Sequence, residues 1–315
     1  MTKKYKKGAP MIIPIFLLLI SSSAFAITNW PYVPFDAAMQ KNNYPQAIPA
    51  TKRIADLNGE ELYDFFKEIY ENINPAVVEH DSKLIIPKII HQIWLGSPVP
   101  ESFVALQQSW IEHHVGRGWM YKLWTDADVA QMQLYNQEYY DATDNYGVKS
   151  DILRWEIIYA FGGVYVDMDY ECLRSLDDLH YTYDFYTALQ PLDTFFVQLG
   201  AALFGAKPGH PILKHCIETI KNDWHLQGAP KKTGPVHFTK SFYACAGADE
   251  NKDIAFPALY FYPLGSQEIQ ENRSGWTQQG SYAVHWWAKS WMPKNYRPFM
   301  FRDIDNDLSA ARWND

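Results

Sequence analysis

Residues 150–171 contain an apolar and polar pattern that predicts a helix, a glycine break and a strand in succession. The first part has helical spacing, and Gly162-Gly163 ends the predicted helix because glycine adopts left-handed backbone conformations at little cost. The apolar run at 164–166 then predicts a short strand. The apolar residues expected on one face of the helix are Ile152, Trp155, Ile158 and Tyr159.

Segments of the same kinds precede this stretch. An apolar, β-branched run at 83–96 predicts a first core strand, and residues 101–114 have the spacing of an amphipathic helix. A second strand is expected at 119–124, followed by a helix that Thr125-Asp126 caps. This order of strand, helix, strand and helix predicts a parallel sheet covered by helices.

Two carboxylates follow the strand predicted at 164–166. Asp167 and Asp169 are two residues apart, so on a continuing strand their side chains project to the same face. Carboxylates held that close repel each other, and a hard divalent cation relieves the repulsion while keeping positions for phosphate oxygens. A bare D-x-D is most often a solvated turn, but Asp151 and Arg154 share a face of the preceding helix, which favours a functional site.

The sequences S-D-I-L-R at 150–154 and G-G-V-Y-V-D-M-D at 162–169 resemble the sugar-donor motif of glycosyltransferase family 32. That family includes initiating α-1,6-mannosyltransferases, inositol-phosphoceramide mannosyltransferases and lactosylceramide galactosyltransferases, and the glucosylating toxins have a similar core. The resemblance extends from Lys83 to Trp291. Its other motifs are I-P-K-I-I-H-Q-I-W-L-G at 86–96, G-A-K-P-G-H-P at 205–211, T-G-P at 233–235, F-Y-P at 261–263 and a closing histidine and S-W at 285–291.

The resemblance implies an α/β fold of the GT-A type, with a Rossmann-like, mostly parallel sheet flanked by helices in a single domain. It also implies a divalent metal, Mn²⁺ first and Mg²⁺ as the alternative. Asp169 would ligate this metal directly, Asp167 would reach the metal or the donor, and His285 would be the third ligand, since imidazole suits a manganese-type site beside carboxylates.

The donor expected from the resemblance is a UDP- or GDP-sugar. Asp151 and Arg154 would hold hydroxyls of the transferred sugar, so the expected catalytic set is Asp151, Arg154, Asp167 and Asp169. Relatives often carry Asn-Ala in the region of residues 199–202, where the asparagine amide contacts the donor or the acceptor. This chain has Leu-Gly-Ala-Ala there, so the resemblance implies no such contact from these residues, and Gln198 is the alternative source of an amide. The residues expected to line the nucleotide or close over its diphosphate are Ile93, Trp94, Tyr165, Ser290 and Trp291.

The N-terminal residues indicate where the protein is sent in the cell, and the chain can be divided into four expected parts. Four lysines, an apolar stretch and Ala24-Phe25-Ala26 indicate a signal peptide for the secretory route, with a secreted or periplasmic product. A retained signal, anchoring the protein in a membrane on the lumenal side, is the alternative. The expected parts are the signal peptide at 1–26, an N-terminal extension with one helix at 27–82, the catalytic domain at 83–296 and a C-terminal tail at 297–315.

Composition narrows the function classes. The net charge of −8 argues against nucleic acid as a partner, because nucleic-acid binding requires a basic face. Three cysteines permit at most one internal disulfide, so this is not a disulfide-stapled scaffold. Aromatic residues make up 16% of the chain, which suits either stacking on sugars and bases or an aromatic core.

The expected activity is metal-dependent transfer of a sugar from a nucleotide-sugar donor to an acceptor hydroxyl, with retention of the anomeric configuration. The acceptor would be a glycan, a glycolipid or a protein. Two alternatives stay open: a secreted toxin or effector on the same scaffold that glycosylates a host protein, and a catalytically inactive carbohydrate-binding protein. Metal-dependent turnover of the donor distinguishes the enzymes from the binding protein.

Overall fold

The computed structural model describes residues 32–73, 83–267 and 280–289. The expected signal peptide, the C-terminal tail, Ser290 and Trp291 lie outside these residues. Within the described ranges, we find no helix that is both long enough and apolar enough to span a membrane.

A central sheet of six strands has the order β2-β1-β3-β6-β5-β7. Strand β1 pairs in parallel with β2 and β3, and β5 pairs in parallel with β7, whereas β6 runs antiparallel to β3 and β5. Five of the six strands therefore share one direction, which confirms the expected α/β fold with a mostly parallel sheet. The strands are β1 Ile89–Ile93, β2 Met120–Trp124, β3 Gly163–Val166, β5 Phe185–Leu189, β6 Leu199–Ala206 and β7 Asp253–Phe256.

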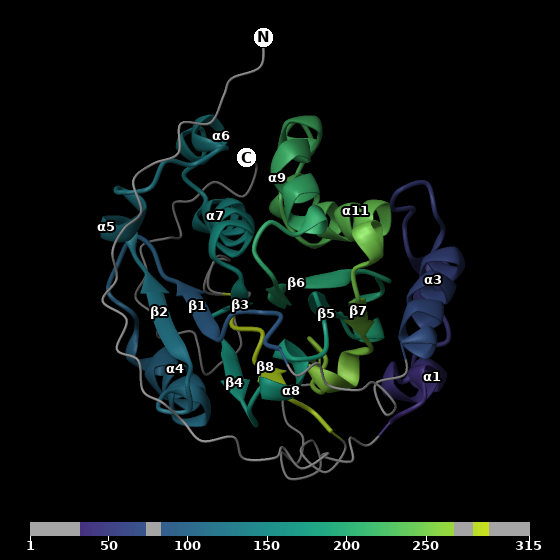
Figure 1. Cartoon of the computed structure of the whole chain (residues 1–315). Helices are drawn as coiled ribbons and strands as arrows, with labels where there is room; N and C mark the ends of the chain where they lie inside the picture. The colour runs from purple at the N-terminus through teal and green to yellow at the C-terminus, as the bar shows by residue number, and fades with distance from the viewer. Residues whose placement is uncertain (1–31, 74–82, 268–279, 290–315) are drawn as a thin grey trace.

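A second, two-stranded antiparallel sheet joins β4 (Tyr170–Cys172) to β8 (Ala283–His285). Helices α7, α9 and α11 lie together on one side of the central sheet, while α4 and the β4–β8 pair lie on the other (Figure 1). The longer helices are α3 Gly59–Asn72, α4 Glu101–His114, α7 Tyr146–Phe161, α9 Pro211–Asp223 and α11 Pro235–Cys245. The short ones are α1 Phe35–Ala38, α2 Ala47–Ala50, α5 Asp126–Val129, α6 Gln137–Asp141, α8 Asp177–His180 and α10 Ala229–Lys232, with 3₁₀ turns at Lys41–Asn43, Leu192–Thr194, Ala248–Glu250 and Ala258–Tyr260.

Helix α7 differs from the sequence expectation in its burial. Every residue from 151 to 158 is buried, so the apolar face predicted for this helix is only part of what it buries. The reason is that α7 is enclosed on several sides: Trp155 alone packs against Phe204 of β6 and Phe238 of α11. The expected stop is confirmed, because Gly162 has φ +65° and a Cβ there would collide with neighbouring prolines.

The N-terminal segment packs on the same core as the sheet. Phe35, Leu62 and Phe66 belong to the main hydrophobic cluster, and the Tyr70 and Tyr260 hydroxyls lie 2.7 Å apart. Asn58 and Glu61 form a capping box that starts α3, and α3 lies beside β7 (Figure 1). One helix was expected in the extension at 27–82, but the segment has the short helices α1 and α2 in addition to α3.

Candidate active site

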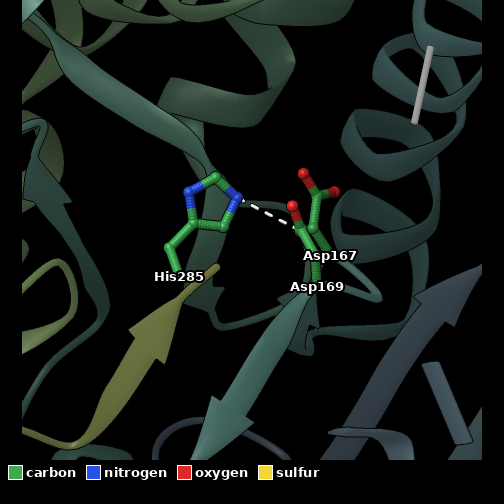
Figure 2. A group of neighbouring side chains, drawn as sticks. All are labelled: Asp167, Asp169 and His285. Carbon is green, nitrogen blue, oxygen red and sulfur yellow. Dashed lines mark hydrogen bonds and ion pairs between the residues drawn. The ribbon is translucent and has the colours of Figure 1, made fainter. Parts of the chain in front are cut away.

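Three potential metal ligands meet where β3 ends. Asp167 follows β3, Asp169 precedes β4, and His285 closes β8, whose pairing with β4 places Tyr170 opposite His285. One ligand atom from each of the three side chains lies within 4.8 Å of the others. Figure 2 shows both carboxylates and the imidazole directed toward one another from these separate elements. The structure thus brings together the three residues expected to bind a metal.

The carboxylates converge for a different reason from the one expected. Residues 167–169 form a turn between β3 and β4, so the alternation of a strand does not align them. The turn is fixed by its backbone: the Asp167 amide donates to the Ala202 carbonyl at 2.8 Å, and the Gln92 side chain donates to the Asp167 carbonyl at 3.3 Å. Gln92 is fully buried on β1, and its support of Asp167 was not foreseen from the sequence.

Asp169 is held by the segment that follows β8. Its Oδ1 lies 3.1 Å from His285 Nε2, and its Oδ2 accepts from the Ala288 amide at 2.8 Å. The intervening Trp287 has φ +51°, a left-handed conformation that is costly for a side chain of this size. Burial acts to raise the pKa of Asp169, but the imidazole and these hydrogen bonds outweigh it and lower the pKa.

Asp167 is the more accessible carboxylate of the two, with 29% of its side chain exposed against 12% for Asp169. Its Oδ1 accepts from the Tyr165 hydroxyl at 2.5 Å and lies 3.4 Å from an Arg154 nitrogen. Burial raises the pKa of Asp167; the guanidinium opposes that rise and the Asp169 carboxylate adds to it. Proximity to a second carboxylate favours binding of a cation between them.

Arg154 and Asp151 form a buried pair beside the carboxylates. An Arg154 nitrogen lies 3.2 Å from Asp151 Oδ1, and the guanidinium also donates to the Ala201 carbonyl at 2.7 Å. Asp151 Oδ2 accepts from the Thr233 hydroxyl at 2.9 Å. Burial raises the pKa of Asp151 to about 6, although Arg154 and Thr233 act in the opposite direction. A pair this buried is not a solvated helix-surface ion pair.

The T-G-P motif owes its place to this pair. Thr233 is fully buried and bonds Asp151, while a Cβ on Gly234 would lie 3.2 Å from Asp151 Oδ2 and 3.0 Å from the Pro230 Cα. The motif was noticed in the sequence, but its contact with Asp151 was not foreseen. No local pattern links positions 82 residues apart.

Three of the residues expected to line the nucleotide, Ile93, Trp94 and Tyr165, lie at or near the carboxyl ends of β1 and β3. Ile93 and Trp94 are buried at the carboxyl end of β1, where the Trp94 indole donates to Ser97 and to the Pro98 carbonyl. Tyr165 on β3 has the Arg154 guanidinium 4.5 Å above its ring. The base-lining roles of these side chains stay predictions, as do those of Ser290 and Trp291.

The three metal-binding side chains suit the metal that the resemblance implies. Two carboxylates and one imidazole suit Mn²⁺ or Mg²⁺ better than a thiolate-preferring metal. One nitrogen of the His285 imidazole is also left without a protein partner: Nδ1 is buried and has no hydrogen bond to any residue that the structure describes.

His91 on β1 has both ring nitrogens engaged within the core. Nε2 lies 3.0 Å from the Gly162 carbonyl, and Nδ1 accepts from the Trp124 indole at 3.0 Å. Burial lowers the pKa of His91 to about 4, which keeps the ring neutral. This histidine therefore supports the strand that leads to the site.

The chain is similar in sequence to known sugar transferases over the region that contains the site. Residues 100–186 match the family model of the glycosyltransferase sugar-binding region containing the DXD motif. The chain is 30% identical over 157 residues to inositol phosphoceramide mannosyltransferase 3 of Schizosaccharomyces pombe. The aligned region covers 49% of this chain and 40% of that protein. It is 29% identical over 226 residues to inositol phosphoceramide mannosyltransferase 1 of the same yeast, covering 69% of this chain and 68% of that protein.

The solved structure of the PaToxG glycosyltransferase aligns with a TM-score of 0.45 and 17% identity, over 60% of this chain and 80% of that one. The chain spans about two fifths of the length of the first curated relatives it matches. The matched region contains Asp151, Arg154, Asp167 and Asp169. These matches confirm the resemblance to the DXD-containing sugar transferases.

Proposed function

We propose that this protein transfers a sugar from a nucleotide-sugar donor to an acceptor hydroxyl, with a divalent metal and with retention of the anomeric configuration. The observation that carries the proposal is the convergence of Asp167, Asp169 and His285 beside the buried Asp151–Arg154 pair. An inactive carbohydrate-binding protein has no need for this set of ligands.

The metal site would serve the diphosphate of the donor. Mn²⁺, or Mg²⁺ in its place, would be held by Asp167, Asp169 and His285. When bound, such an ion neutralises the charge that develops on a diphosphate leaving group. The Ala288 amide keeps the Asp169 carboxylate in position.

The Asp151–Arg154 pair would orient the transferred sugar. Arg154 is anchored by the Ala201 carbonyl and stacked on Tyr165, so its planar fork has little freedom to lose on binding neighbouring hydroxyls. Asp151 is fixed by Thr233 and accepts hydrogen bonds when ionised. The two side chains thus provide a hydrogen-bond donor, Arg154, and a hydrogen-bond acceptor, Asp151, in fixed positions.

The relatives suggest where to begin with substrates. Two of them are named inositol phosphoceramide mannosyltransferases. We therefore propose a mannosyl donor and a glycolipid acceptor as the first pair to test, with glycan and protein hydroxyls next. We place the protein in the secretory route, which agrees with the signal expected at 1–26.

The decisive experiment incubates the purified chain with Mn²⁺ and a panel of UDP- and GDP-sugars, and records release of free nucleotide with and without EDTA. Many transferases slowly hydrolyse their donor when no acceptor is present. Release that EDTA abolishes, from one donor alone, would support the proposal and name the sugar. No release, together with no thermal shift by any UDP or GDP ligand, would favour a binding protein instead.

A further inference from the structure

Phe195 combines two features that each cost free energy. Its backbone is left-handed, with φ 59° and ψ 30°, a conformation that is unfavourable for a bulky side chain. The side chain is also 46% exposed, although Leu192 and Val197 on either side of it belong to the main hydrophobic cluster. Of the eight residues other than glycine that have positive φ in the described ranges, only Phe195 and Trp287 are aromatic. Trp287 borders the metal ligands, and strained residues of this kind gather at functional sites.

The loop that carries Phe195 joins β5 to β6 and is held from two sides. At its base, the Gln190 amide donates to the Gln198 carbonyl at 2.9 Å, and the Gln198 side chain donates to that of Gln190 at 2.8 Å. Farther along, the Val197 amide donates to the Thr51 hydroxyl of the N-terminal segment at 3.0 Å. The left-handed conformation of Phe195 is therefore imposed by a well-bonded loop, which is how backbone strain persists in a fold.

This loop stands at the edge of the sheet where the site lies. Strand β6 runs antiparallel to both β3 and β5, so β5 ends and β6 begins at the edge where β3 leads into Asp167. On β6, the Ala201 carbonyl accepts from Arg154, and the Ala202 carbonyl accepts from the Asp167 amide. The strand order from the expected base site onward is β1-β3-β6-β5. With the base near β1, the diphosphate at the metal ligands and the transferred sugar at Arg154, the acceptor approaches from the β5 side.

A shallow, mainly apolar hollow adjoins the foot of the loop. Its lining comes from the loop, the N-terminal segment and the segment after β7, and includes Pro191, Leu192, Met39, Leu259 and Pro263. The Phe195 amide donates to the Leu192 carbonyl at 3.0 Å, so Phe195 lies one 3₁₀ turn from this hollow. An exposed aromatic ring beside an apolar surface suits a hydrocarbon chain better than a charged or strongly polar group.

We infer that Phe195 contacts a hydrocarbon chain of the acceptor, and that the loop at 190–198 forms the acceptor side of the site. The inference rests on the proposed function. It commits to one class of acceptor, a glycolipid, in preference to a free glycan or a protein. An acceptor that covers the ring removes apolar surface from water, which offsets the cost of holding Phe195 exposed on a strained backbone.

A matched control lies at the opposite end of β3. Phe161 is 44% exposed, close to the value for Phe195, and comes just before Gly162 and the start of β3. Its ring centroid lies 5.6 Å from that of Trp124 and 6.4 Å from that of His91. The two phenylalanines thus share their exposure, and they differ in backbone conformation and in which end of β3 they adjoin.

The test compares Phe195→Asn, Phe195→Trp and Phe161→Asn with the wild-type full chain. With Mn²⁺ present, nucleotide release from the donor is measured with octyl glycosides of mannose, glucose and galactose as acceptors, and with the matching methyl glycosides, which lack the hydrocarbon chain. We expect Phe195→Asn to raise KM for the octyl glycoside that the wild type uses by ~5- to 10-fold, because about half of a phenylalanine side chain no longer leaves water on binding.

The other readouts should stay at their wild-type values. In Phe195→Asn these are KM for the methyl glycoside and nucleotide release without acceptor. Phe195→Trp, which keeps an apolar ring, and Phe161→Asn, which lies at the other end of β3, should both use the octyl glycoside as the wild type does.

Thermal melting separates a contact residue from a structural one. Asparagine adopts the left-handed conformation readily, so Phe195→Asn should melt at or above the wild-type temperature, whereas Phe161→Asn loses its ring contacts and should melt below it. An unchanged KM for the octyl glycoside, an equal rise for the methyl glycoside, or a loss of melting temperature together with donor turnover would overturn the role of Phe195.

The remaining outcomes distinguish this inference from the proposed function. If the wild type turns over a donor and no octyl glycoside stimulates it, the lipid acceptor and the role of Phe195 are overturned while the proposed transferase stands. If the wild type turns over no donor, with or without acceptor, the proposed function is overturned and this inference with it.

Discussion

Two histidine–aspartate pairs in this molecule have the same chemistry and opposite surroundings. His285 Nε2 lies 3.1 Å from Asp169, and His210 Nε2 lies 2.9 Å from Asp253. In the second pair every polar atom is used: His210 Nδ1 accepts from the Ile212 amide at the start of α9, and Asp253 Oδ2 accepts from the Gly247 amide at 2.9 Å. That pair joins α9 to β7 and needs no ligand.

The pair at the β4–β8 sheet is incomplete by comparison. Asp167 adds a second carboxylate within 4.8 Å, and His285 Nδ1 has no partner in the part of the chain that the structure describes. The fully satisfied pair contributes to stability, whereas excess charge and an unpaired ring nitrogen indicate a place where a ligand completes the structure. Matched substitutions in the two pairs should therefore affect different properties.

The largest effect is expected from Asp169→Asn, set against Asp253→Asn. Losing one carboxylate of the metal-ligand set should lower kcat by ~100-fold or more, because the developing charge of the diphosphate loses its stabilisation. Asp253→Asn should leave kcat per folded molecule near the wild-type value. Steady-state assays with the donor found by nucleotide release test both, and an active Asp169→Asn enzyme would remove Asp169 from the ligand set.

His285→Ala should weaken Mn²⁺ binding by ~100-fold or more, because removing a direct ligand costs at least as much as removing a residue that only supports one, which costs ~10- to 100-fold. The remaining carboxylates still attract the ion, so binding should weaken and not disappear. Calorimetric titration of Mn²⁺ measures the change, with His210→Ala as the control that keeps wild-type affinity. Equal affinities for wild type and His285→Ala would place the histidine outside the metal shell.

His210→Ala should instead lower the free energy of unfolding, by about 3 kcal/mol, because it leaves Asp253 buried without its partner. Denaturant unfolding of this variant beside His285→Ala tests the contrast. The comparison fails if His285→Ala proves the less stable of the two.

The smallest effect concerns His91, whose ring nitrogens contact the Gly162 carbonyl and the Trp124 indole. Burial lowers its pKa to about 4, below the ordinary value of 6.5. The unfolded chain therefore binds the proton more tightly, and this histidine's contribution to stability, complete above pH 6.5, is lost as the pH falls toward 4. We expect a slope of about 1 kcal/mol per pH unit in that window from this residue. The slope should become shallower in His91→Gln, measured by denaturant unfolding at several pH values.

Much of the framework could be predicted from the sequence. The helix at 101–114 begins and ends as its apolar spacing predicts, and Gly162 ends α7 where expected. The D-x-D and the Asp–Arg pair also stand out, because each lies within one short segment whose order of elements gives it meaning. Local periodicity and glycine placement determine such features, and these are properties of consecutive residues.

Only the tertiary structure decided how distant residues complete the site. His285 joins Asp169 across 116 residues because β8 pairs with β4, and Thr233 reaches Asp151 because α10, which Thr233 follows, packs against α7. A sequence pattern shows which side chains are apolar or charged, but long-range packing chooses their neighbours, and at this site those neighbours carry the chemistry.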